Sequence, residues 1–286
     1  MKKRIPTFGS EKEAAEFWDT HDSTDFLDEL VEDTETVFVR PAKVGLMDGL
    51  INFHKPTGIT SAKALYKVRA ITKQKKSGHA GTLDPAASGV LILCMGKATK
   101  LVESIMDHPK VYRTTARLDV TSESFDSDRP LMPVPVTSPP GESAVREALA
   151  GFEGTIQQVP PGISAIKVGG VPAYKRAGAD AQVALAPRPV TIYWLHLHRY
   201  DFPVIDFEMC CGRGTYVRSL IRDLGTRLGT GGVLTSLVRT QIGPFKLESA
   251  WTLDALKNAT DPRAYLIDLL DAKSLFTQSR VIPPKP

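Results

Sequence analysis

The sequence predicts an α+β fold in which a mixed, mainly antiparallel sheet is flanked by helices. Segments that alternate apolar and polar residues, or that are apolar throughout, indicate strands at residues 50–54, 90–94, 111–118 and 205–211. Segments whose apolar residues recur at helical spacing lie between these strands. The sequence contains no internal repeat. Strands interspersed with helices in this way are typical of a layered α+β domain.

Length and composition limit the protein classes that fit. The chain has 286 residues, 42% of them hydrophobic, which suffices for one large or two ordinary domains. No apolar run reaches the roughly 18 residues that span a bilayer, and the basic N-terminus lacks the apolar stretch of a secretory signal. Three cysteines form neither a disulfide framework nor a four-ligand metal pattern. We therefore expect a cytoplasmic protein without a membrane segment or a bound metal.

Charge is distributed unevenly along the chain. Residues 11–35 contain eleven of the 32 acidic residues and one of the 36 basic residues, so the rest of the chain carries a net charge of +14. A surplus of this size suits a polyanionic partner. The change in composition near residue 49 indicates three regions: an acidic N-terminal extension (1–48), a compact domain (49–255) and a short C-terminal tail (256–286).

The compact domain opens with a strand, a turn and a helix. Residues 50–54 indicate the strand, residues 55–58 the turn, and Thr60 or Ser61 the cap of a helix that continues to Ala70. The cluster Lys73-Gln74-Lys75-Lys76 follows. A solvated loop is one interpretation of that cluster, and contact with RNA phosphates is an equally good one if an RNA site lies beside it.

Further helices are indicated at residues 97–106 and 142–149, and a third follows the strand 205–211. The third helix has a strong apolar stripe and ends at Gly229. The stripe consists of Val217, Leu220, Ile221, Leu224 and Leu228. We expect Thr215 to be the N-cap of this helix and Arg222 to lie on its solvated face.

Asp84 lies between a glycine-punctuated loop and the apolar run 90–94. Pro85 fixes its own φ and disfavours a helical conformation at Asp84, while Gly81 permits a sharp turn. On spacing alone, the better interpretation is that Asp84 caps a helix whose first residue is Pro85. A catalytic carboxylate is the alternative.

Motifs in the compact domain resemble those of one known family. The string Gly78-His79-Ala80-Gly81-Thr82-Leu83-Asp84-Pro85-Ala86-Ala87-Ser88-Gly89-Val90-Leu91 resembles the active-site segment of the bacterial tRNA pseudouridine-55 synthase family. Five further segments are similar to motifs of the same family: the turn at 55–58, residues 157–167, residues 188–192, Gly214-Thr215-Tyr216-Val217-Arg218 and residues 234–245. They occur in the correct order, and the resemblance covers about residues 49–255.

This resemblance implies a pseudouridine synthase-like fold and the isomerisation of uridine to pseudouridine in the T-loop of tRNA, at position 55. It implies a monomer that binds the T-arm of tRNA and needs no cofactor, because the reaction changes neither oxidation state nor atom count. Asp84 is implied as the catalytic carboxylate, Arg218 as its ion-pair partner, and Tyr112 as a side chain that stacks on the target uracil or takes a sugar proton. The remaining implied contacts to substrate are His79, Tyr216, Leu237, Lys55, Gly81, Thr82, Lys167 and Arg239.

Residues 119–129 and 178–180 depart from the family pattern, and the tail is too short to build the C-terminal RNA-binding module that many members carry. These departures leave open a non-catalytic tRNA-binding or RNA-folding protein on the same scaffold. A hydrolase or phosphotransferase with a nucleophilic aspartate would need a cluster of acids near Asp84. Asp126 and Asp128 lie in the divergent segment, and we expect both to be exposed to solvent.

The acidic extension is similar, over residues 13–25, to short segments of small bacterial antitoxin-like proteins. It is either a mobile appendage or a nucleic-acid mimic that masks the RNA surface. If it masks that surface, deletion of residues 1–46 should change the affinity for RNA, and an unchanged affinity would refute the hypothesis.

Overall fold

The computed structural model describes Pro6, Glu13 and residues 48–162, 167–168, 171–172, 185–277 and 281–286. The elements below belong to the unit that spans Val44–Pro286. The hypotheses on the acidic extension therefore lie outside the described residues. So does most of the segment 163–184, including the side chain of Lys167.

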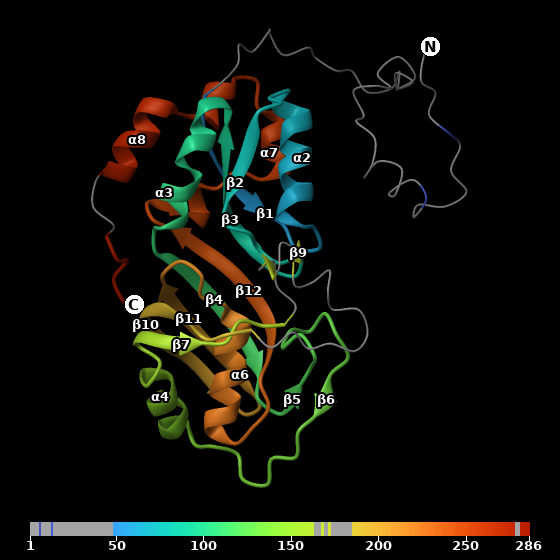
Figure 1. The fold of residues 1–286 in the computed structure, drawn as a ribbon, viewed down its shortest axis with the longest axis vertical. Coiled ribbons are helices and arrows are strands. Elements are labelled where there is room, and N and C mark those ends of the chain that lie inside the picture. The colour runs from blue at the N-terminus through green and yellow to red at the C-terminus, as the bar shows by residue number, and fades with distance from the viewer. Residues whose placement is uncertain are drawn as a thin grey trace. The chain divides into compact units, whose positions relative to one another are not determined.

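The described residues form a ten-stranded sheet in which antiparallel pairs predominate (Figure 1). Its main path runs β14-β1-β3-β12-β4-β11-β10-β7, with β13 paired to β12 and β2 paired to β3. The strands β3 and β12 are parallel where Ser88 and Gly89 face Val238 and Arg239. The sheet strands are β1 (Gly49–Lys55), β2 (Ser77–Ala80), β3 (Ser88–Met95), β4 (Lys110–Arg117), β7 (Gly154–Gln158), β10 (Arg188–Asp201), β11 (Val204–Cys211), β12 (Val233–Ile242), β13 (Phe245–Lys246) and β14 (Ile267–Asp268). This confirms the predicted α+β class with a mixed, mainly antiparallel sheet.

Two short ribbons lie outside this sheet. The strands β5 (Val120–Thr121) and β6 (Met132–Pro133) pair with each other, as do β8 (Lys167–Val168) and β9 (Val171–Pro172). The first ribbon contains the start of the segment that departs from the family pattern. The second lies between β7 and β10 in the chain, next to undescribed residues.

Helices cover both faces of the sheet around β1 and β3, in the upper half of Figure 1. On one face, α2 (Ser61–Thr72) and α7 (Leu253–Asn258) pack on Ile51, Phe53 and Leu91. On the other face, η2 (Gly96–Leu101), α3 (Val102–Met106) and α8 (Leu269–Thr277) pack around Leu50 and Ile92. A strand that is buried on both faces has no polar side to show, which explains the continuous apolar run in β3.

The remaining strands are covered on one face by α4 (Glu142–Ala150) and α6 (Val217–Leu228), in the lower half of Figure 1. The apolar stripe of α6 packs against Phe207 and Ile192 of this face. Side chains of β4 alternate between buried and half-buried beyond Tyr112, as expected for a strand with one packed face. The connections are completed by η3 (Leu247–Ser249) and η4 (Pro262–Ala264).

Helix boundaries agree closely with the sequence analysis, with two corrections at α6. Thr60 caps α2 and Gly229 ends α6 at a φ of 68°. The N-cap of α6 is Tyr216 and not Thr215, because the Thr215 hydroxyl donates instead to the Gly212 carbonyl at 3.2 Å. The expected solvated face at Arg222 is also wrong, since this half-buried guanidinium donates to the Val159 carbonyl at 3.0 Å.

No helix in the described part of the chain is long and apolar enough to span a bilayer.

Candidate active site

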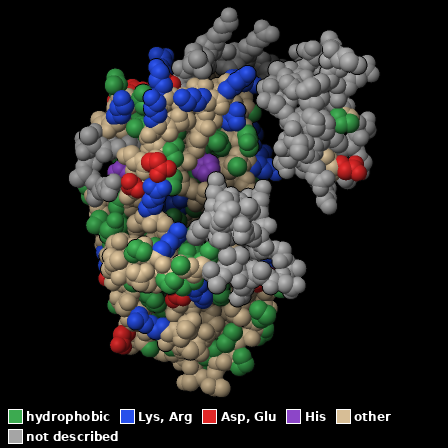
Figure 2. All heavy atoms as spheres, viewed as in Figure 1, with side chains coloured by type: hydrophobic (Ala, Val, Ile, Leu, Met, Phe, Trp, Pro, Cys, Tyr) green, Lys and Arg blue, Asp and Glu red, His purple; other side chains and the backbone are tan. Residues whose placement is uncertain are grey.

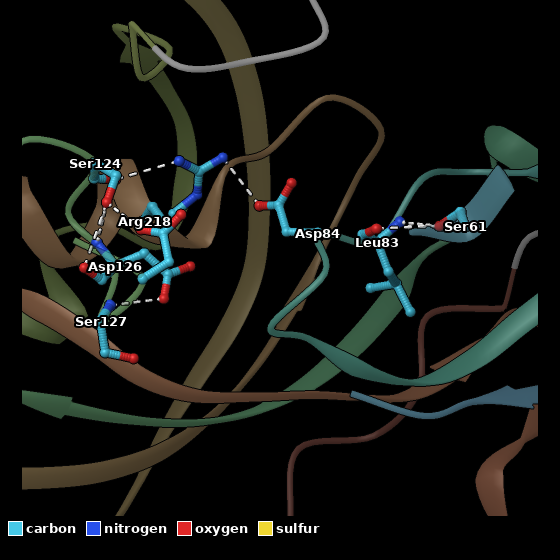
Figure 3. Close-up of polar contacts among 8 residues, drawn as sticks. Ser61, Leu83, Asp84, Ser124, Asp126, Ser127 and Arg218 are labelled. Atoms are coloured by element: carbon cyan, nitrogen blue, oxygen red, sulfur yellow. Dashed lines mark hydrogen bonds and ion pairs between the residues drawn. The ribbon is translucent and has the colours of Figure 1, made fainter. Parts of the chain in front are cut away.

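Asp84 lies in the loop between β2 and β3, and neighbouring residues hold the backbone on both sides of it. The Ser61 hydroxyl at the start of α2 accepts from the Leu83 N–H at 2.9 Å and donates to the Leu83 carbonyl at 3.1 Å (Figure 3). The Gly58 N–H donates to the Pro85 carbonyl at 2.8 Å. A turn follows Asp84 and leads directly into β3, so the helix-cap interpretation is wrong. An Asp-Pro pair favours a helix start locally, but the residues that follow it here pair with the sheet as β3 and form no helix.

Arg239 of β12 ties the two ends of this loop together. Its guanidinium is buried and donates from Nε to the Val90 carbonyl at 2.7 Å and from Nη2 to the Gly81 carbonyl at 3.0 Å. Gly89 has a φ of +109°, and a Cβ there would lie 2.2 Å from the Arg239 carbonyl oxygen. Only glycine allows β3 to approach β12 this closely. Arg239 thus shapes the loop through Nε and Nη2, and because it also lines the cavity described below, its expected contact with substrate stays a prediction.

Lys55, by contrast, is a correction to the expected substrate contacts. Its side chain is fully buried at the end of β1, where RNA cannot reach it. The ammonium donates to the carbonyls of Ile59 at 2.7 Å, Pro56 at 2.9 Å and, at 3.5 Å, Pro85. Burial lowers the pKa of Lys55 to about 8. Lys55 therefore supports the turn beneath Asp84 and does not contact substrate.

The depressed pKa of Lys55 gives a test of this burial. Between pH values of about 8 and 10.5 the unfolded chain keeps a proton on this lysine that the folded protein has released. Stability then rises with pH, by at most about 1.4 kcal/mol per pH unit. We expect the unfolding free energy of the native chain minus that of Lys55→Met to increase across this window in denaturant titrations. A difference that is independent of pH would place the ammonium in water.

Arg218, the second residue of α6, forms the predicted ion pair with Asp84. Its Nη2 lies 2.9 Å from Asp84 Oδ2, and its Nη1 donates to the Ser124 carbonyl at 3.2 Å (Figure 3). The arginine side chain is 7% exposed, whereas the aspartate side chain is 43% exposed. A buried cation thus orients a carboxylate that remains accessible from one side.

Asp126 lies on the other side of Arg218 (Figure 3). Its carboxylate is buried and accepts from the Ser127 N–H at 2.8 Å, whereas Asp128 is exposed. Burial and the nearby Asp128 raise the pKa of Asp126. The expectation of solvent exposure is therefore wrong for Asp126 and correct for Asp128. The irregular segment between β5 and β6 folds inward at Asp126, and no local periodicity signals this.

A cavity of about 500 Å³ lies at the Asp84–Arg218 pair, and it is large enough for a small ligand. Eight of the residues implied by the family resemblance line this cavity: Gly81, Thr82, Asp84, Tyr112, Tyr216, Arg218, Leu237 and Arg239. Neither His79, which is half-buried in β2, nor Lys55 lines it. The tertiary structure thus brings these eight residues from four separate segments to one place.

Tyr112 lines the cavity from β4 with its ring almost wholly buried. Burial raises the pKa of this phenol above its usual value. A raised pKa makes the phenolate form, which proton abstraction needs, scarcer, so the ring surface is the more available contact for a ligand. This agrees with stacking as the expected role.

Sequence reasoning missed two basic residues of this cavity. Lys110, two positions before Tyr112, is buried and donates to the carbonyls of Met106 and, at 2.7 Å, His108. Burial lowers the pKa of Lys110 to about 8. Arg213 forms ion pairs with Glu103 at 2.8 Å and Asp107 at 3.1 Å. A lysine at a strand end and an arginine in a glycine-rich turn are normally exposed to solvent. Only the tertiary contacts therefore show that Lys110 and Arg213 belong to the cavity.

Within the described residues, no group of three His, Cys, Asp or Glu side chains is arranged to hold a metal ion.

Comparison with known families explains this constellation. The model of the TruB family pseudouridylate synthase, N-terminal domain, matches residues 69–217. The chain belongs to the TruB family. The model of the tRNA pseudouridylate synthase B C-terminal domain matches residues 218–272 of this TruB-family chain. A model of the CopG antitoxin of type II toxin–antitoxin systems matches residues 3–40. This range contains residues 13–25, whose acidic string resembles segments of antitoxin-like proteins.

Individual TruB-family relatives cover most of the chain. The tRNA pseudouridine synthase B of Bordetella avium is 39% identical over 225 residues, which are 78% of this chain and 92% of that protein. The protein of the same name from Clostridium acetobutylicum is 40% identical over 211 residues, 73% of this chain and 72% of that one.

Two solved structures are also similar. A chain of the crystal structure of a Cbf5-Nop10-Gar1 complex superposes with a TM-score of 0.58 at 30% identity, over 73% of this chain and 53% of that one. A chain of an H/ACA RNP bound to a substrate RNA containing 2′-deoxyuridine gives a TM-score of 0.55 at 28% identity, over 73% and 52%. The TruB-family chain thus aligns with about half the length of each solved chain.

Proposed function

We propose that this protein isomerises uridine to pseudouridine at position 55 in the T-loop of tRNA, with Asp84 as the catalytic carboxylate. The observation that carries the proposal is the half-exposed Asp84 carboxylate, paired at 2.9 Å with Arg218 in a cavity that Tyr112, Tyr216 and Leu237 line. The tRNA substrate follows from TruB-family membership and from the names of the bacterial relatives. Position 55 follows from the motif resemblance.

The reaction needs little more than a placed carboxylate. The bond between N1 of uracil and C1′ of ribose breaks, the base turns, and C5 bonds to C1′; C5 then loses its proton and N1 gains one. Atoms and electrons balance within the nucleotide, so no external group donor takes part. Asp84 can act as a nucleophile towards the sugar or can abstract a sugar proton as the glycosidic bond weakens. Both routes require an ionised Asp84 that reaches the ribose.

The cavity suits a base that has left its stack. An enzyme that acts on a nucleotide within folded RNA must extrude that nucleotide into a pocket. Tyr112 offers a buried ring as a stacking surface, and Tyr216 and Leu237 line the same space. A cavity of about 500 Å³ accommodates a uracil and its ribose.

A tritium-release assay tests this proposal directly. Unmodified tRNA with tritium at C5 of its uridines should lose tritium to water when the protein is present. A matched transcript with cytidine at position 55 should lose none. Release that is the same from both transcripts would refute the position, and no release from either would refute the enzyme. The second result would instead support the non-catalytic RNA-binding protein, which no observation in the structure favours.

The helix α2 and its C-terminal extension form a strongly basic surface next to the site. Residues 61–76 contain six Lys or Arg and no Asp or Glu. Lys63 and Lys67 are exposed one turn apart, beside Tyr66, which is 62% exposed. Figure 2 shows Lys and Arg side chains over the region of α2. Since the helix begins at Ser61, which binds the Asp84 loop, RNA in the cavity would have phosphates within reach of this surface.

Salt dependence measures that contact. Each phosphate contact that is lost should lower the slope of log affinity against log salt by about one. We therefore expect Lys63→Ala/Lys67→Ala to weaken tRNA binding and to lower this slope by about two. The matched control is Lys246→Ala/Lys273→Ala, which removes two other exposed lysines. An equal effect of both pairs would indicate general attraction by net charge instead of contact along α2.

A further inference from the structure

Tyr216, the N-cap of α6, is held in the cavity by two side chains that come from strands of the sheet. We propose that Gln158 and Arg188 are positioning residues of the reaction, which fix Tyr216, and with it the first turn of α6, against the target nucleotide. This proposal rests on the proposed function. Gln158 is the last residue of β7 and Arg188 the first residue of β10, and the two face each other in the sheet.

Gln158 grips the backbone of Tyr216 at both of its polar groups. The Tyr216 N–H donates to Gln158 Oε1 at 2.8 Å, and Gln158 Nε2 donates to the Tyr216 carbonyl at 3.1 Å. The glutamine is 1% exposed. The Gln158 side chain thus makes the two hydrogen bonds to the Tyr216 backbone that a neighbouring strand would make to an extended residue. A carboxylate would only accept and asparagine is one methylene shorter, so glutamine is the side chain that completes this pair.

Arg188 holds the ring and the turn that precedes it. Its guanidinium carbon lies 5.1 Å from the centroid of the Tyr216 ring, a cation–π distance. Its Nη2 donates to the Gly214 carbonyl at 2.8 Å. The ring thus has a fixed planar cation on one side, and the glycine-rich turn before α6 is tied to β10.

The same end of β7 also fixes the helix that carries Arg218. The Val159 carbonyl accepts from the Ser219 hydroxyl at 2.8 Å and from Arg222 Nη2 at 3.0 Å. Residues 158 and 159 therefore hold the chain on both sides of Arg218, which itself pairs with Asp84. A shift of this strand end would move the cavity wall at Tyr216 and the guanidinium at Arg218 together.

The test separates positioning from binding and from folding. Gln158→Met removes both hydrogen bonds at similar size, and Gln158→Glu retains the acceptor for the Tyr216 N–H but places an oxygen against the Tyr216 carbonyl. Gln157→Met, at the exposed neighbour on the same strand, is the matched control. Single-turnover pseudouridine formation at saturating enzyme gives the maximal rate, tRNA titration gives Kd, and thermal melting reports folding.

Misplacement of a catalytic group by about 1 Å can cost about 100-fold in rate. We therefore expect both Gln158 variants to lower the maximal rate by about 10- to 100-fold without a change in tRNA Kd, and Gln157→Met to change neither. A folded Gln158→Met protein with the native rate overturns the proposal. So does a loss of rate that is fully explained by a weaker Kd.

A second measurement decides the matter even if Gln158→Met unfolds. If Arg188 acts through the ring of Tyr216, Arg188→Ala should slow the native enzyme but have no further effect on Tyr216→Ala. Independent, additive losses would overturn the positioning role of Arg188 through the Tyr216 ring. A native chain that forms no pseudouridine refutes the proposed function and this inference with it, whereas an active native chain with unaffected Gln158 and Arg188 variants refutes the inference alone.

Discussion

Asp84→Asn should lower tritium release by more than about 10⁴-fold, a loss of the size seen when a nucleophile or base is removed from an enzyme. The amide can neither attack the sugar nor accept its proton, so both routes fail. The substitution keeps the size of the side chain, and the loop keeps its contacts to Ser61, Gly58 and Arg239. We therefore expect tRNA binding, measured by filter retention at constant salt, to stay close to that of the native chain.

The control for this variant is Asp223→Asn. Asp223 also pairs with an arginine, Arg222 at 2.8 Å, but it does not line the cavity. If loss of any ion pair between an aspartate and an arginine of α6 slows the reaction, both variants should be slow. If Asp84 is the catalytic group, only Asp84→Asn should be slow. Near-normal turnover by Asp84→Asn would show that the carboxylate does no chemistry.

Arg218→Lys should lower the maximal rate by about 100-fold or more, although the charge is retained. The guanidinium binds Asp84 Oδ2 through Nη2 and the Ser124 carbonyl through Nη1 at the same time. An ammonium is a single point and cannot span both partners in one plane. In this buried position a lysine would also tend to lose its proton, which would weaken the ion pair further. Single-turnover rates measure the loss, and tRNA affinity should be retained.

Arg227→Lys is the matched control for Arg218→Lys. Arg227 lies in the last turn of the same helix, where it donates to the Ala148 carbonyl at 3.0 Å, outside the cavity. Its replacement should leave the rate intact. Equal rates for the two variants would mean that positive charge alone at position 218 suffices, and would remove the geometric role assigned to the guanidinium.

Elements with a local signal could be predicted from the sequence. The strands β1, β4 and β11 and the helices α2, α4 and α6 carry apolar residues at a period that one segment reveals by itself. The cap at Tyr216 could not be predicted, because the better capping residue, Thr215, is engaged by the Gly212 turn. Asp84 likewise has two interpretations in the sequence, because an Asp-Pro pair is compatible with a helix start. Only the pairing of the following residues with the sheet excludes that helix.

The candidate site divides in a similar way. The motif resemblance identified Asp84, Tyr112, Tyr216, Arg218 and Leu237, and the structure brings all five to one cavity. The resemblance did not distinguish residues that face the cavity from residues that support it. Lys55 is basic and lies in a matching motif, yet its ammonium binds backbone carbonyls of the supporting turn and it does not line the cavity. Arg239 binds the Asp84 loop and also lines the cavity. Which of these residues line the cavity depends on which segments pack against each other.

The amino-acid sequence by itself determined the main strands and helices, the family and Asp84 as the candidate for a catalytic carboxylate, because periodicity and motif are properties of contiguous residues. The tertiary structure alone decided that Asp126 turns inward to Arg218, that Lys55 is sealed beneath the loop, and that Gln158 and Arg188 reach Tyr216. These contacts join residues far apart in the chain. Each depends on the sheet order, which places β7 beside β10 and β3 beside β12 and which no single segment encodes.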